Sequence, residues 1–199
     1  MALAKTLLSL LALATVALAS PTAIVPRQQD APSTGSVRRP AMHNIFPQQP
    51  DAHRGPLTGL HLETFANLSQ LEQVAVFRGI PAAASNCVLQ WDQADKDSRT
   101  FIVKGGSGLT RMRLLEGLPD GPITFDSIRP FDTAADEDQF GADFTLWDDE
   151  MYGAQTHIAS SIPCAEDIFI KISMRDPTTK TSLYLGQDDN NGLWIEYDL

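Results

Sequence analysis

Short apolar runs separated by Gly, Pro, Asn and Asp recur from residue 58 to the end of the chain. In the clearest run, 168–174, every second residue is a large aliphatic one, so these side chains share one face of a strand: Ile168, Ile170, Ile172 and Met174. We interpret further runs as strands at 74–77, 87–91, 100–103, 109–115, 123–125, 155–162, 183–185 and 193–197. The turn formers at 187–192 predict a hairpin between the last two strands.

The segment 58–72 fits two interpretations. Apolar and polar residues alternate at 60–64 as in a strand, although apolar residues at 60, 65, 68 and 71 also recur at nearly helical spacing. We favour the strand. With it, residues 58–199 are predicted to form an all-β domain, an antiparallel β-sandwich, because many short strands separated by turn residues are typical of that architecture.

An immunoglobulin-type sandwich does not fit the sequence. Trp91 follows Cys87 by four residues instead of lying a strand later, and Ile162 occupies the position two before Cys164 where that fold has a tyrosine.

The first 19 residues have the pattern of a secretory signal peptide. Lys5 precedes an apolar run at 6–18, which is shorter than the roughly 20 residues of a membrane-spanning helix. Ala17, Leu18 and Ala19 fit the small-x-small cleavage pattern, although an uncleaved N-terminal anchor is the alternative. No later stretch is apolar over 18 residues, so we expect a secreted protein without a membrane span, in the extracellular space or cell wall.

Residues 20–57 are rich in Pro, Gln, Ser and Ala without a sustained period, which predicts a disordered linker or pro-segment. Arg38 and Arg39 form a dibasic pair that a secretory processing protease could cut, but Pro40 disfavours that cleavage. Asn67, Leu68 and Ser69 form an N-glycosylation sequon, plausible on an exported chain.

Export makes a disulfide the expected state of the two cysteines, Cys87 and Cys164, with two free thiols as the alternative. A bridge closing a loop of this length stabilises a domain by about 4.5 kcal/mol in the chain-entropy model. Because Cys87, Leu89 and Trp91 share a strand face, the bridge is also a candidate staple between two sheets.

The chain has 25 Asp and Glu against 15 Lys and Arg, a net charge of −10, which argues against nucleic-acid binding. Eight of the acids lie in one segment, 132–153, that we read as a loop. Oxygen-rich loops can bind Ca²⁺, and Asp136, Asp138 and Asp143 are weak candidates. The spacing matches no EF-hand, so a solvated acidic loop without a cofactor is the favoured interpretation.

No motif for an enzyme is present. His157 has neither a Gly-x-Ser-x-Gly elbow nor a zinc-binding His-Glu-x-x-His pattern near it, and a packing role is favoured. Pairs of carboxylates can hydrolyse glycosidic bonds, but a chain this acidic brings such pairs together by chance.

The three tryptophans suggest a binding role. Trp91 is expected in the core, and Trp194 faces away from its neighbours Leu193 and Ile195. Exposed aromatic side chains on a sandwich can stack on sugar rings. The possible ligand patch is therefore built on one tryptophan of the acidic loop and its neighbours: Trp147, Asp148, Asp149 and His157.

Five segments carry a resemblance to a known family: FRGIP at 77–81, NCVLQW at 86–91, GADFTLW at 141–147, GAQTH at 153–157, and LGQD at 185–188 with NG at 191–192. Together they resemble the C-terminal domain of the fungal ubiquitin-3-binding-protein family. The resemblance implies a β-sandwich, a fungal source and a secreted, non-enzymatic role; binding to the ubiquitin pathway does not fit an export signal.

The sequence therefore predicts a secreted, non-enzymatic β-sandwich glycoprotein that binds cell-wall or other extracellular polysaccharide or a surface protein. The alternatives are a glycan-active hydrolase that uses a carboxylate pair and a secreted effector that binds a host protein.

Overall fold

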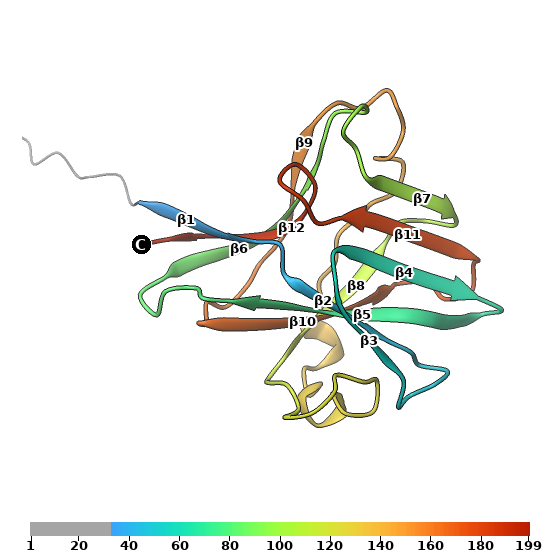
Figure 1. Cartoon of the computed structure of the whole chain (residues 1–199), viewed down its shortest axis with the longest axis horizontal. Coiled ribbons are helices and arrows are strands. Elements are labelled where there is room, and N and C mark those ends of the chain that lie inside the picture. The colour runs from blue at the N-terminus through green and yellow to red at the C-terminus, as the bar shows by residue number, and fades with distance from the viewer. Residues whose placement is uncertain (1–32) are drawn as a thin grey trace, which may run out of the picture. The chain divides into compact units, whose positions relative to one another are not determined.

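A computed structural model describes residues 33–199, which form two antiparallel β-sheets packed as a sandwich (Figure 1). Twelve strands and two short 3-10 turns follow one another along this part of the chain: β1 Thr34–Arg38, β2 Ala41–Ile45, β3 His53–Leu57, β4 Gly59–Phe65, β5 Leu68–Arg78, β6 Ser85–Gln93, β7 Phe101–Gly105, β8 Thr110–Leu115, η1 Arg129–Phe131, η2 Asp136–Asp138, β9 Gln155–Ser161, β10 Asp167–Met174, β11 Thr181–Gly186 and β12 Gly192–Asp198. The all-β prediction is confirmed.

The smaller sheet has four strands in the order β1-β12-β6-β9, so the first and last described strands are neighbours (Figure 1). The larger sheet has eight, in the order β3-β2-β5-β4-β11-β7, with β10 paired to both β5 and β8. Strand β5 is long enough to change partners: its first residues pair with β4, and its later residues lie between β2 and β10.

The main core lies between the two sheets. It is formed by the apolar side chains that alternate with polar ones along the strands, as the sequence predicted. The four aliphatic residues at even positions of β10 are buried there, as are Cys87, Leu89 and Trp91 of β6. Trp194 faces the other side of its sheet, as predicted, where the guanidinium of Arg38 lies 4.2 Å from its ring centroid.

A second, smaller core covers the outer face of β5 and β10. The connection between β8 and β9, yellow in Figure 1, places Ile128 there against Val74, Val76 and Leu115. A half-buried ion-pair network closes its edge: Lys171 Nζ lies 3.2 Å from Asp132, which also binds Arg113 at 2.9 Å. Part of the predicted acidic loop is thus neutralised inside the fold.

The prediction of a disordered linker at 20–57 is wrong for residues 34–57, which form β1, β2 and β3. Their apolar residues are few, but each meets a strand from far along the chain: Met42 is in the main core and Ile45 in the smaller one. Arg38 and Arg39 belong to this folded part, paired with Asp92 and Asp189 respectively.

Two local predictions are also wrong. Residues 123–125 are not a strand but lead into the turns that cover the smaller core. The segment 187–192 does not make a hairpin, because β11 and β12 belong to different sheets and each already has two neighbours. The segment instead carries the chain from one sheet to the other.

The preference for strand at 58–72 is confirmed. Strands β4 and β5 are joined by Ala66 and Asn67, both with positive φ, which is the backbone of a tight two-residue hairpin turn. The sequon asparagine is exposed at the tip of this hairpin.

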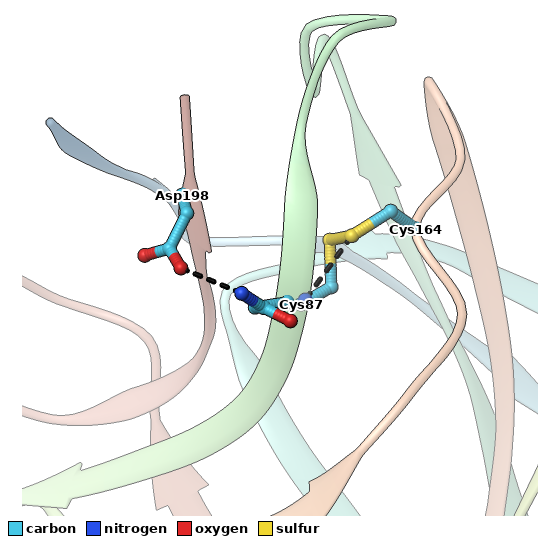
Figure 2. The surroundings of a disulfide bond; sticks show 4 residues. Cys87, Cys164 and Asp198 are labelled. Carbon is cyan, nitrogen blue, oxygen red and sulfur yellow. Dashed lines mark hydrogen bonds between the residues drawn. A yellow bond between two sulfur atoms is a disulfide. The ribbon is translucent and has the colours of Figure 1, made fainter. Parts of the chain in front are cut away.

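The predicted disulfide is confirmed: Cys87 of β6 is bonded to Cys164 in the connection from β9 to β10 (Figure 2). Since β9 and β10 lie in different sheets, the bridge fastens the smaller sheet to the segment that crosses to the larger one. Beside it, Asn86 donates a hydrogen bond to Asp198 at the end of β12.

The predicted signal peptide at 1–19 lies outside the described residues, as do residues 20–32. Within 33–199, no helix has the length and apolar character needed to cross a membrane.

Candidate functional site

Two members of the predicted ligand patch, Trp147 and His157, are in contact. Their ring centroids are 4.3 Å apart in an edge-to-face arrangement, and the Tyr152 ring centroid lies 4.8 Å from that of Trp147. His157 in turn stacks on buried Trp91, with centroids 3.8 Å apart and planes at 13°. Trp147 therefore anchors its loop against the core and is only partly open to solvent.

Between Trp91 and Trp147, the imidazole ring of His157 is held in its neutral form. Its Nε2 is buried and has no hydrogen-bond partner among the described residues. Burial lowers the pKa of His157 below 6.5, and the nearby carboxylate of Asp92 only partly opposes this. The packing role predicted for His157 fits this environment better than proton transfer does.

The two acids of the predicted patch serve the backbone. Asp148 accepts a hydrogen bond from the Val103 amide of β7 at 2.8 Å, and Asp149 accepts one from the Met151 amide at 2.9 Å. Strand β7 is an edge of the larger sheet, so its outward-facing backbone N–H groups have no partner strand. The carboxylate of Asp148 accepts the hydrogen bond of one of them. The four predicted residues therefore do not form one ligand surface.

Arg99, which sequence reasoning missed, organises the loop that carries Trp147. Its guanidinium donates hydrogen bonds to the carbonyl oxygens of Ala94, Trp147, Asp149 and Tyr152. One cation thereby links the β6–β7 connection to the segment 147–152. No motif marks such a residue, because its partners are backbone atoms, three of them about 50 positions away.

The calcium candidates Asp136 and Asp143 are each bound to different groups of the protein. Asp136 lies 3.7 Å from Arg113 and accepts from Gln139, whereas Asp143 accepts from the Thr145 amide at 2.9 Å. Asp138 is exposed on η2. Over residues 33–199, no group of three or more His, Cys, Asp or Glu side chains is arranged to hold a metal ion.

A polar cup of about 430 Å³ lies at the end of β6, between the 93–98, 154–156 and 189–190 segments. Three carboxylates line it, and each is engaged. Asp92 binds Arg38 at 2.7 Å, Asp95 accepts from the Ala154 amide at 2.9 Å, and Asp189 pairs with Arg39. These acids were not singled out in the sequence.

The outer face of β4, β11 and β7 presents aromatic and polar side chains in register. We call this surface the outer strip. Its first row is His61, Tyr184 and Ile102, its second row is Glu63, Ser182 and Lys104, and Phe65 and Lys180 lie at its end. Tyr184, Ile102 and Phe65 are 38%, 41% and 58% exposed.

The ring of Tyr184 lies against the sheet because its neighbour is a glycine. A Cβ on Gly59 would come within 2.7 Å of the Tyr184 ring. His61 meets the same ring edge-on, with centroids 6.1 Å apart. The tyrosine is therefore held along the sheet with a side open to solvent.

A hollow of about 600 Å³ lies at the end of the outer strip, lined by residues that include Glu63, Phe65, Lys104 and Lys180. It is bordered by the β4–β5 hairpin that carries Asn67. Sequence reasoning missed the strip, because its residues come from three strands about 40 to 120 positions apart.

When the chain is compared with protein-family models, with curated proteins and with solved structures, nothing matches in any of the three. The resemblance to the fungal ubiquitin-3-binding-protein family stays a prediction.

Proposed function

We propose that this chain is a secreted, non-enzymatic protein that binds polysaccharide of the cell wall or of another extracellular surface. The observation that carries the proposal is the outer strip, where Tyr184 and Phe65 are exposed on a regular sheet face. Sugar rings have an apolar C–H face and a polar rim. An aromatic ring flanked by hydrogen-bonding side chains complements both.

The surroundings of Tyr184 support this role. Its ring is supported from below by Gly59 and from the side by His61, so little conformational freedom is lost when a sugar packs on it. Glu63, Ser182 and Lys104 in the next row offer both donors and acceptors at the rim.

Asp176 and Asp188 are unsuited to the acid step of glycoside hydrolysis. A glycosidase needs one carboxyl group with a raised pKa as its general acid. The pKa values of Asp176 and Asp188 are lowered instead. Hydrogen bonds from the Thr178 side chain and amide lower the pKa of Asp176. At Asp188 burial acts to raise the pKa, but hydrogen bonds from Asn190, Asn191 and Thr100 outweigh it.

The test is retention of the secreted protein on a panel of insoluble polysaccharides, with and without Ca²⁺. We expect Tyr184→Ala to lose most of the retention of the wild type. Ile158→Ala removes an exposed apolar side chain from the other sheet and is the matched control. Failure of the wild-type protein to bind any polysaccharide would refute the proposed function.

Export and modification belong to the same proposal. We infer removal of residues 1–19 and attachment of a glycan to Asn67, which is exposed at a hairpin tip. Expression in a eukaryotic secretory host, followed by N-terminal sequencing and intact mass, tests both. The expected N-terminus is Ser20, and the glycan mass is expected to disappear in Asn67→Gln.

A further inference from the structure

The hollow at the end of the outer strip has a charge that differs from the rest of the protein. The chain carries a net charge of −10, yet two lysines, Lys104 and Lys180, face this hollow. Within residues 33–199 neither forms an ion pair with Asp or Glu. Instead, Lys180 Nζ lies 5.6 Å from the ring centroid of Phe65.

One acid, Glu63, shares the hollow with these two lysines, so the formal charge there has one positive unit in excess. Glu63 lies 2.9 Å from His61 Nε2, on the side of the strip that faces Tyr184. The hollow therefore has two cations available to a ligand, beside an exposed aromatic ring. Lysine ammonium groups bind carboxylates as point charges with three donors each.

The order of residues along the outer strip predicts how a long ligand would lie on it, which is parallel to the strands. Tyr184 is paired with His61 on β4, and Phe65 follows His61 by four residues, which is about 13 Å along a strand. Lys104 lies in the row between the two aromatic residues, and Lys180 lies next to Phe65. An extended polysaccharide that lies along the strands would contact the ring of Tyr184 first and then the ammonium group of Lys104. It would reach Lys180 and the ring of Phe65 together at the end of the strip.

We propose that the outer strip binds an acidic polysaccharide, a polymer of uronic acid units, with its carboxylates at Lys104 and Lys180 and sugar rings on Tyr184 and Phe65. The inference rests on the proposed function and narrows its ligand. A neutral polysaccharide would use the rings but gain nothing from the lysines. A polyanion is repelled by the net negative charge of the protein. Its binding therefore depends on the local attraction of Lys104 and Lys180.

The experiment compares two polymers with the same backbone: polygalacturonate and its methyl-esterified, neutral form. Affinity is measured with the full secreted protein at several salt concentrations. We expect the wild type to prefer the acidic polymer, and the preference to decrease with salt. Replacing both lysines, Lys104→Gln with Lys180→Gln, is expected to weaken binding of the acidic polymer roughly three- to tenfold, since each exposed ion pair contributes modestly.

Two variants make the outcome specific. Lys96→Gln removes an exposed lysine of the β6–β7 connection and is expected to change nothing. Phe65→Ala is expected to weaken binding of both polymers. Thermal unfolding of each variant checks that the fold is retained.

The failures of the two proposals are distinguishable. Equal binding of both polymers, or binding that the lysine pair does not affect, would overturn the acidic ligand and leave the proposed function standing. No binding to any polysaccharide would overturn both.

Discussion

Burial among aromatic neighbours lowers the pKa of His157, and Asp92 opposes this only in part. Trp91 lies on one face, and Trp147 meets the ring from the loop. Asp92 on β6 is the charged group that acts on it. The unpaired, buried Nε2 would carry a proton without an acceptor, so protonation is coupled to loosening of this contact.

The sign of the pH dependence follows from the lowered pKa. The folded state binds the His157 proton less readily than the unfolded state does, so its contribution to stability is present above the ordinary pKa of 6.5 and decreases as the pH falls through the folded-state pKa. We expect the free energy of unfolding in urea to fall between pH 7 and pH 5, and to fall less in His157→Phe, which retains an aromatic stack.

His43 has a pKa lowered by burial and by His53, and it contributes in the same direction. The contribution of His157 is therefore the difference in pH-dependent stability between the wild type and His157→Phe. An equal loss of stability in the two proteins would show that His157 is not responsible.

At the scale of elements, the segment 147–152 is held by the packing of Trp147 and by hydrogen bonds from one side chain, Arg99. Arg99 binds three carbonyls of this segment and the Ala94 carbonyl, which links the segment to the β6–β7 connection. Replacing Arg99 leaves those carbonyls without this donor.

We expect Arg99→Met to lower the free energy of unfolding by about 1–3 kcal/mol, the usual effect of leaving partly buried polar groups unpaired. Limited proteolysis is expected to cut near Leu146 and Met151 more rapidly, since both are exposed. Arg175→Met, an exposed arginine whose guanidinium makes no hydrogen bond or ion pair within residues 33–199, is the control. Equal cleavage of all three proteins would contradict this role for Arg99.

Strand β1 is an edge strand whose loss has two effects. It is hydrogen-bonded along β12, and its Arg38 covers Trp194. We expect a truncation that begins at Pro40 to unfold at lower temperature and to self-associate through the uncovered β12 edge, seen by size exclusion. A truncation that begins at Ser33 is the matched control. If both truncations behaved alike, the strand would contribute nothing.

At the scale of the whole molecule, the disulfide connects the two sheets through a crossover. The Cys87→Ala, Cys164→Ala variant is expected to lose about 2–5 kcal/mol in free energy of unfolding, measured in urea. Thiol titration of the unreduced wild-type protein is expected to find no free thiol, and two titratable thiols would disprove the bridge.

The sequence indicated much of the sandwich because alternation is a local property. The aliphatic face of β10 and the buried face of β6 were readable from one strand each. Strands β1 to β3 were not, since they contain few apolar residues and are defined by their partners, which are β12 for β1 and β5 for β2. The outer strip was invisible for the same reason, because Lys104, Ser182 and Glu63 become neighbours only through strand register.

The pairing of β1 with β12 also sets an order of events. The smaller sheet contains one early strand and three later ones, and β12 is the element that joins β1 to β6. Strand β12 follows β1 by more than 150 positions, so this sheet cannot close until both of these distant segments have left the ribosome. Folds dominated by such distant pairings assemble slowly. Strand β1 therefore remains without its partner strand until the residues of β12 have been synthesised.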